Sequence, residues 1–165
     1  MDLKRFWRHV RMSPIRASRC FPPSTLDAIQ REIAAQEEAH SGEIFFVVEA
    51  ELTSGQLWQG VTARDRARQV FALQGVWNTA ENNGVLVYVL LADRAVEIVA
   101  DRGIDAHLDT GQWREICGEM EARFSEDRYE EGALAGVRAI AGRMARHFPG
   151  QGPRRNELPD RPLVL

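Results

Sequence analysis

Several features that would point directly to a function are scarce or missing in this sequence. The chain has two cysteines, Cys20 and Cys117, and no C-x-x-C pair, so we expect both thiols to be reduced and buried. No stretch reaches the roughly 18 to 20 apolar residues that a membrane span requires. The basic N-terminus is not followed by the apolar segment of a secretory signal. These absences predict a cytoplasmic protein.

Signatures of covalent catalysis are also missing. The sequence has no G-x-S-x-G nucleophile elbow, no C-x5-R phosphate loop and no P-loop. Its four histidines share no metal-ligand spacing: His9, His40, His107 and His147. A phosphatase built on this chain would therefore depend on a bound cation to activate water.

Charge and proline content limit the partners and the extent of the domain. The 165 residues carry 21 basic and 24 acidic side chains, and the resulting net charge of -3 gives no pull towards nucleic acid. Proline is absent from residues 24–148, whereas residues 149–165 hold four of the seven prolines. We therefore expect one domain followed by a disordered tail at residues 150–165.

The longest apolar stretch marks the centre of the fold. Residues 85–91 are apolar at every position, so both faces of this strand must be covered. Residues 43–52 alternate as a second strand, and a helix at 61–73 connects the two, which makes them parallel. A tight turn at 92–94 leads into an antiparallel strand at 96–101. The expected fold is a three-layer α/β/α sandwich with a small mixed sheet, a parallel β-α-β unit plus an antiparallel hairpin.

Helices with one apolar face flank this sheet in the sequence. They are expected at residues 24–39, 112–124 and 129–148, where apolar side chains recur with the helical period. Together with the strands they define an α/β domain at residues 22–149.

Residues 1–21 precede this domain as a basic amphipathic helix. Leu3, Phe6, Trp7 and Val10 fall at helical spacing. Six basic residues accompany them against the single acid Asp2: Lys4, Arg5, Arg8, Arg11, Arg16 and Arg19. One interpretation is a helix that binds a membrane surface or a partner. The other is a helix whose Phe6-Trp7 ridge packs on the domain while its arginines face water.

The segments around the hairpin resemble the TPM domain family. The likeness rests on Asn82-Asn83-Gly84-Val85-Leu86, on Ala92-Asp93-Arg94 and on Val96-Glu97-Ile98-Val99-Ala100-Asp101-Arg102-Gly103-Ile104. It extends to His40-Ser41-Gly42-Glu43-Ile44 and covers residues 22–149. The family takes its name from thylakoid lumen proteins, a photosystem II repair protein and a receptor-modulating protein. This chain looks like its short soluble bacterial subtype.

The resemblance implies an α/β/α sandwich and a domain of mostly unknown function. Family members have been linked to weak acid phosphatase activity, to divalent cation binding and to the assembly or repair of membrane complexes. The family pattern has an aspartate where this chain has Asn78. A neutral amide there would weaken any cation site that used this position.

One group of candidate site residues lies where the second strand begins and the third ends. Oxygen ligands for Ca²⁺ or Mg²⁺ are available there from Asn82, Asn83, Asp101 and Asp105, with Arg102 beside them. The alternative is that the Asn-Asn-Gly motif is turn chemistry, with its amides bonded to nearby backbone and Asp101 paired with an arginine.

A second group lies at the opposite end of the sheet. Glu49, Glu51 and Asp93 would form a carboxylate cluster there, next to Arg94, beyond the carboxyl ends of the parallel strands. The alternative is that Asp93-Arg94 builds the hairpin turn and that the glutamates are solvated.

These observations favour a non-enzymatic module that binds an unknown protein partner and holds a divalent cation. Two other functions stay open. One is a weak metal-dependent acid phosphatase, and the other is a peripheral membrane adaptor that acts through residues 1–20.

Overall fold

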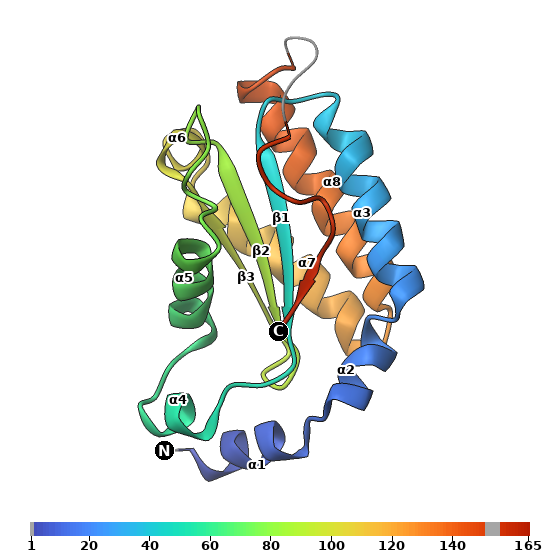
Figure 1. The fold of residues 1–165 in the computed structure, drawn as a ribbon, viewed down its shortest axis with the longest axis vertical. Helices are drawn as coiled ribbons and strands as arrows, with labels where there is room; N and C mark the ends of the chain where they lie inside the picture. Colours follow the sequence, from blue (N-terminus) through green and yellow to red (C-terminus); the bar gives the residue numbers. More distant parts are fainter. Residues whose placement is uncertain (1, 151–155) are drawn as a thin grey trace.

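A four-stranded mixed sheet forms the centre of the fold (Figure 1). The computed structural model describes residues 2–150 and 156–165. The strands lie in the order β3-β2-β1-β4, with the bounds β1 Glu43–Glu49, β2 Gly84–Leu90, β3 Ala95–Ala100 and β4 Leu163–Val164. β1 and β2 are parallel, and β2 and β3 are antiparallel. The predicted α/β fold, a parallel unit followed by an antiparallel hairpin, is confirmed.

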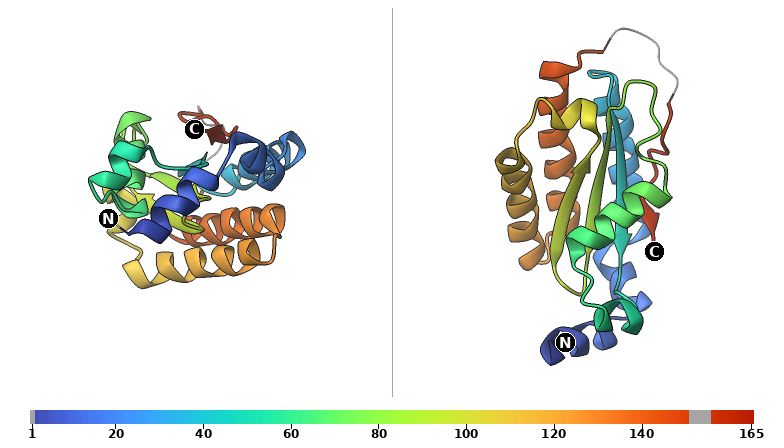
Figure 2. Two further views of the ribbon diagram at one scale, coloured as in Figure 1. Left: turned by 90° about the horizontal axis from the view of Figure 1, so that it is seen from below. Right: turned by 90° about the vertical axis from the view of Figure 1, so that its left-hand side faces the viewer.

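Helices cover both faces of this sheet, as Figure 2 shows from two further directions. α3 (Pro23–Glu37), α7 (Thr110–Ser125) and α8 (Tyr129–His147) pack on one face. α5 (Ala63–Leu73), which lies between β1 and β2 in the chain, packs on the other. Four shorter helices are α1 Leu3–Arg11, α2 Pro14–Cys20, α4 Ser54–Trp58 and α6 Arg102–Asp105. No helix in the described part of the chain is both long enough and apolar enough to cross a bilayer.

Strand β2 is buried along its whole length because it lies between two apolar clusters. Its odd-numbered residues from Val85 to Val89 join the cluster formed with α3, α7 and α8. The even-numbered residues from Leu86 to Leu90 join the cluster formed with α5. Full burial of one such side chain stabilises a fold by about 1.5–3 kcal/mol. The strand that is apolar on both faces is therefore the one that holds the two outer layers together.

The C-terminal segment differs from its prediction. Disorder was expected at residues 150–165, but residues 156–165 lie against the sheet, where β4 pairs in parallel with Val47 and Val48 of β1. Leu158 is buried and its N–H donates to Glu43 Oε2 at 3.2 Å. Residues 151–155 lie outside the described residues. The tail packs on the edge of β1 and pairs with backbone groups there that would otherwise be open.

The N-terminal segment also differs from its prediction. The sequence pattern predicted one basic helix, whereas the structure has two, α1 and α2, separated by Met12 and Ser13. The break is local, since Ser13 caps α2 and accepts a hydrogen bond from the Arg16 N–H at 3.3 Å. α1 consequently lies across the lower end of the molecule in Figure 1, and α2 leads back to α3.

Gly84 is required by a close approach rather than by its backbone angle. A Cβ atom at this position would lie 2.1 Å from the carbonyl oxygen of Val76. We expect Gly84→Ala to lower the free energy of unfolding by about 1–3 kcal/mol in a urea titration, because the backbone must shift to make room. Gly142→Ala in α8 is the control, since nothing lies within 4 Å of its added Cβ. It should be neutral or stabilise by up to about 1 kcal/mol. Equal effects of the two changes would contradict the steric explanation.

Candidate functional site

The Asn82-Asn83-Gly84 motif lies at the amino end of β2, where hydrogen bonds hold both asparagines. Asn82 has φ 53°, a left-handed conformation that asparagine tolerates better than most residues. Its Oδ1 accepts a hydrogen bond from Arg102 Nη2 at 3.1 Å. Asn83 is buried, and its Nδ2 donates to the Ser41 carbonyl at 2.5 Å. Both amides therefore bond to the chain around them and shape the entry to β2.

The end of β3 is joined to this loop. Asp101 donates its N–H to the Gly84 carbonyl at 2.8 Å, and its Oδ1 accepts from the Arg102 N–H at 2.7 Å. Gly103 donates to the Asn82 carbonyl at 3.0 Å, which ties α6 to the same loop. The structure thus brings four of the predicted residues together: Asn82, Asn83, Asp101 and Arg102. The arginine predicted to pair with Asp101 through its side chain bonds to an asparagine instead.

Two buried oxygens at this end have no hydrogen-bond donor among the described residues. Asn83 Oδ1 and Asp101 Oδ2 are buried and accept no hydrogen bond from the residues described. A buried oxygen without a donor is costly, and a hard cation such as Ca²⁺ or Mg²⁺ would satisfy it. Within residues 2–150 and 156–165, no three carboxylate, imidazole or thiol side chains form a metal-ligand group. A cation here would complete its coordination with backbone carbonyls or water.

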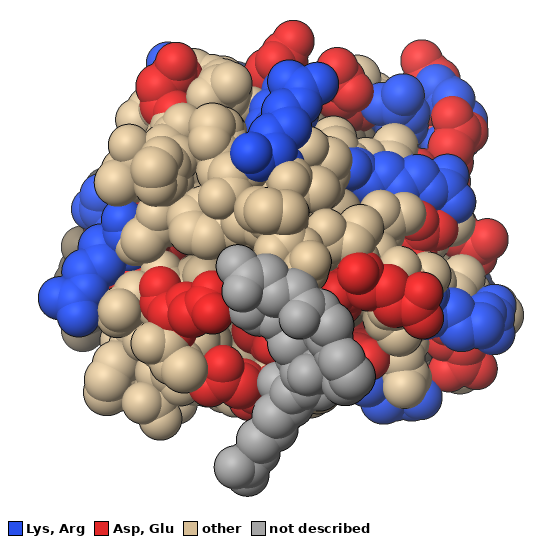
Figure 3. All heavy atoms as spheres, turned by 90° about the horizontal axis from the view of Figure 1, so that it is seen from above, with Lys and Arg blue, Asp and Glu red and all other residues tan. Residues whose placement is uncertain are grey.

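Carboxylates gather at this same end, which Figure 3 views directly. Glu37 accepts a hydrogen bond from the Ile44 N–H at 3.1 Å and lies near Glu43 and Asp160. Burial raises the pKa of Glu37 to about 8. The hydrogen bond from Ile44 lowers this pKa in part, and repulsion from the two neighbouring carboxylates raises it further. Burial also raises the pKa of Glu43. This end of the molecule therefore holds more protons near neutral pH than its sequence suggests.

At the opposite end, Asp93 binds the N-terminal helix and not a carboxylate cluster. Arg5 binds both carboxylate oxygens. Its Nη2 donates to Oδ2 at 2.7 Å, and its Nε lies 3.0 Å from Oδ2 and 3.2 Å from Oδ1. Arg8 Nη2 and His9 Nε2 both approach Oδ1, at 3.0 and 3.1 Å. Burial alone would raise the pKa of Asp93, but the bonds from Arg5 and His9 outweigh it and hold that pKa below its usual value.

His9 is the residue that sequence reasoning missed. It is 1% exposed, and its Nδ1 accepts a hydrogen bond from the Leu52 N–H at 2.9 Å. The ring proton is therefore on Nε2, which donates to Asp93. Arg5 and His9 are one helical turn apart, which is the only local sign of a shared inward face. Their partner lies 84 residues after His9, so nothing local identifies it.

The remaining residues predicted at this end are separated. Glu51 is exposed, and Glu49 is buried and bonded to Arg66 Nε at 2.9 Å and to the Tyr88 hydroxyl at 2.5 Å. Arg94 is exposed and has φ 53°, and its N–H closes the β2–β3 turn on the Leu91 carbonyl at 3.1 Å. The carboxylates predicted to cluster are thus engaged with different cations or with solvent.

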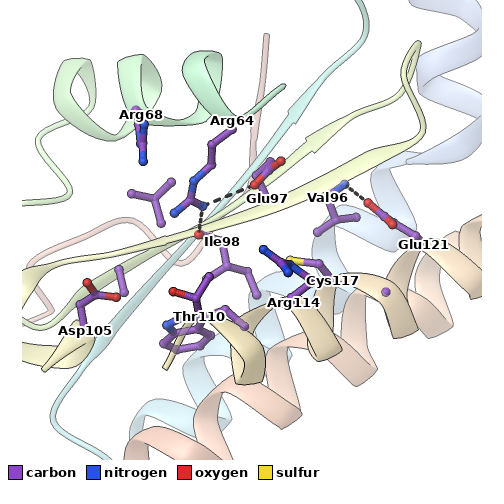
Figure 4. Close-up of a pocket in the computed structure, with 14 residues that line it drawn as sticks. Arg64, Arg68, Val96, Glu97, Ile98, Asp105, Thr110, Arg114, Cys117 and Glu121 are labelled. Atoms are coloured by element: carbon purple, nitrogen blue, oxygen red, sulfur yellow. Dashed lines mark hydrogen bonds and ion pairs between the residues drawn. The ribbon is translucent and has the colours of Figure 1, made fainter. Parts of the chain in front are cut away.

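A groove of about 690 Å³ follows the outer edge of β3, between α5 and α7 (Figure 4). Two side chains bond to the backbone of this edge strand. Arg64 donates to the Ile98 carbonyl, and Glu121 accepts from the Val96 N–H at 2.8 Å. Asp105, predicted as a cation ligand, is exposed and lines this groove instead of joining Asp101. The bonds from Arg64 and Glu121 occupy positions that a neighbouring strand would otherwise take.

The cysteine in this groove is a poor nucleophile. Burial, with added repulsion from Glu97 and Glu121, raises the pKa of Cys117 to about 12. The thiolate is the nucleophilic form, and it is scarce near neutral pH at such a pKa. Cys117 is therefore a poor candidate for a nucleophile.

The raised pKa of Glu37 predicts a stability that depends on pH. A carboxyl that binds its proton more tightly when folded stabilises the fold at low pH, and this contribution is lost as pH rises from 4.5 towards 8. We expect wild type to unfold more easily at about pH 9 than at about pH 6, by on the order of 1 kcal/mol after allowance for partial solvent exposure. Glu37→Gln should reduce this difference in a thermal melt, and Glu38→Gln, which changes the exposed C-cap residue of α3, should not. An unchanged pH profile in Glu37→Gln would contradict the assignment.

Comparison with known proteins identifies relatives of this fold. The BA42 protein from the psychrophilic bacterium Bizionia argentinensis is 26% identical, with a TM-score of 0.75, over 86% of this chain and 92% of that one. The N-terminal domain of a P. gingivalis protein is 21% identical, with a TM-score of 0.63, over 81% of this chain and 83% of that one. The N-terminal domain of the cg2496 protein from Corynebacterium glutamicum is 14% identical, with a TM-score of 0.56, over 83% and 82%.

Two further comparisons bear on the family. No curated protein matches this chain. The family model described as the TPM domain matches residues 17–143, which is more than half of the sequence. The chain therefore belongs to the TPM domain family.

Proposed function

We propose that this chain is a non-enzymatic binding module that contacts an anionic membrane surface through α1. The observation that carries the proposal is the outward face of this helix. Leu3, Trp7 and Val10 lie at positions i, i+4 and i+7, on one side of α1, and are 61%, 52% and 53% exposed. An exposed stripe of large apolar residues on an amphipathic helix is typical of binding at a bilayer interface.

Basic residues border this apolar stripe. Lys4, Arg8 and Arg11 repeat the same spacing one position further along α1, and they surround Trp7 in a shallow depression. Such cations attract the anionic lipid surface of a cytoplasmic leaflet, each by about 1 kcal/mol. If the protein is cytoplasmic, as its sequence predicts, this is the leaflet it would meet.

The inward contacts of α1 fix which face remains outside. Arg5 and His9 bind Asp93, Arg5 Nη2 also donates to the Val61 carbonyl at 2.8 Å, and Phe6 packs against the apolar cluster under α5. The helix cannot turn its apolar stripe inward without breaking these bonds. The stripe is therefore presented to solvent by a rigid attachment.

Other exposed apolar residues lie near the same end. Ile15 in α2 is 68% exposed, and Trp58 in α4 is 75% exposed. α4 lies beside α1 at the lower end of the molecule in Figure 1. Isolated apolar residues on a surface are ordinary, but a group on adjacent elements is typical of a binding site.

Sedimentation with lipid vesicles tests this function. Wild type should bind vesicles that contain phosphatidylglycerol, with binding that weakens as salt rises, and should bind pure phosphatidylcholine vesicles poorly. Trp7→Ser with Val10→Ser should weaken the partition by at least about tenfold, because two apolar side chains no longer enter the interface.

The matched control is Leu73→Ser with Trp77→Ser, which removes two apolar side chains that are 75% and 54% exposed outside α1. This control should bind as wild type does. Equal losses in both double variants, or equal binding to neutral and anionic vesicles, would contradict the proposal.

A divalent cation at the other end of the sheet is a second candidate function. It is favoured by the two buried oxygens without donors, Asn83 Oδ1 and Asp101 Oδ2. Such a cation would stabilise the fold, and it is also the group that a metal-dependent phosphatase of this family would need to activate water.

A thermal melt of metal-stripped protein titrated with Ca²⁺, Mg²⁺ or Mn²⁺ tests this site. A cation at about 100 times its Kd stabilises by roughly 2.7 kcal/mol, which shifts the melt by several degrees. Asp101→Ala should lose this shift, and Asp105→Ala, which removes an exposed carboxylate on α6, should keep it. A flat titration, or the same shift in Asp101→Ala, would exclude a cation at this position.

A further inference from the structure

A hollow of about 530 Å³ lies between the N-terminal helices and the β2–β3 turn. Its lining includes three apolar side chains, Leu91, Ala92 and Met12. Its walls carry five arginines: Arg8, Arg11, Arg16, Arg19 and Arg94. A volume of this order suits a small ligand, since binding pockets span about 300–1,000 Å³.

Most of these arginines have no side-chain partner among the residues that the structure describes. Arg8 bonds to Asp93, but Arg11, Arg16, Arg19 and Arg94 make no ion pair or hydrogen bond through their guanidinium groups to the residues described. One carboxylate, Asp127, lies among them. Asp93, bound to Arg8, and Asp127 offset part of the positive charge of the five guanidinium groups, and a multiply charged anion would reduce the repulsion that remains.

The position in the fold supports a binding role. Leu91 and Ala92 directly follow β2, so the hollow lies beyond the carboxyl end of the parallel pair β1–β2. Open α/β sheets usually bind their ligands at this end. Two of the walls, α1 and α2, come from the segment that is docked there by Asp93.

We infer that this hollow binds a phosphate-bearing anion through Arg16, Arg19 and Arg94, with Arg8 and Arg11 at its rim. Guanidinium groups bind phosphate oxygens in a bidentate geometry, and several of them discriminate a doubly charged phosphate from a single carboxylate. The ligand is either a lipid headgroup with a phosphate monoester or a free phosphate compound. The lipid source rests on the membrane function proposed above, and the free source does not.

Calorimetry with inorganic pyrophosphate on the full chain tests the shared chemistry. Wild type should show one saturable site, and Arg16→Ala with Arg19→Ala should raise its Kd by at least about tenfold. Arg94→Asn, which suits the left-handed backbone at that position, should also weaken binding. The control, Arg31→Ala with Arg114→Ala, removes the same charge from two exposed arginines outside the hollow and should stay within about twofold of wild type.

Binding to lipid vesicles distinguishes a lipid headgroup from a free phosphate compound as the ligand. If the ligand is a lipid, pyrophosphate should displace the protein from vesicles with phosphatidic acid, and Arg16→Ala with Arg19→Ala should lose its preference for these over phosphatidylglycerol vesicles. If the ligand is a free phosphate compound, pyrophosphate should bind without displacing the protein from either vesicle.

The outcomes also separate this inference from the membrane proposal. Trp7→Ser with Val10→Ser should keep pyrophosphate binding even where it loses vesicle binding. Unchanged pyrophosphate affinity in the arginine variants of the hollow, or an equal loss in the Arg31 and Arg114 control, would overturn the inference.

Discussion

One carboxylate, that of Asp93, holds the N-terminal helix α1 on the rest of the fold. Asp93 lies at the tip of the β2–β3 turn, and three residues of α1 converge on it: Arg5, Arg8 and His9. Because a bidentate arginine and a buried imidazole both bind it, the helix is fixed in rotation as well as in position. Its outward apolar stripe and the arginine-lined hollow behind it are both consequences of that attachment.

The two ends of the sheet differ in their charged groups. Residues 1–20 hold six basic residues against one acid, although the whole chain has a net charge of -3. The far end gathers carboxylates, among them Glu37 and Glu43, whose pKa values burial raises.

The sequence predicts the core of this fold better than its attachments. Residues 85–91 are apolar on both faces, and such a pattern is a local signature of a central strand. The bond between His9 and Asp93 has no such signature, because the two residues are far apart and several acids would serve equally. The prediction of a disordered tail is wrong because prolines indicate only that a segment is not helical, and a segment without a helix can still pack. The burial of Leu158 depends on a surface that other segments build. The candidate residues Asn82, Asn83, Asp101 and Arg102 were correctly placed together because strand direction alone determines which ends meet.

The groups that cover the two outer edges of the sheet affect whether copies of the chain can pair with one another. An open strand edge is a template on which another copy of a chain can pair and start an endless array. Here β4 covers part of β1 with the chain's own C-terminal residues, and Arg64 and Glu121 bond to outward backbone groups of β3. Each edge is thus partly occupied by groups from within the molecule. Contacts made within the molecule therefore reduce the backbone that is open to pairing between two copies of the chain.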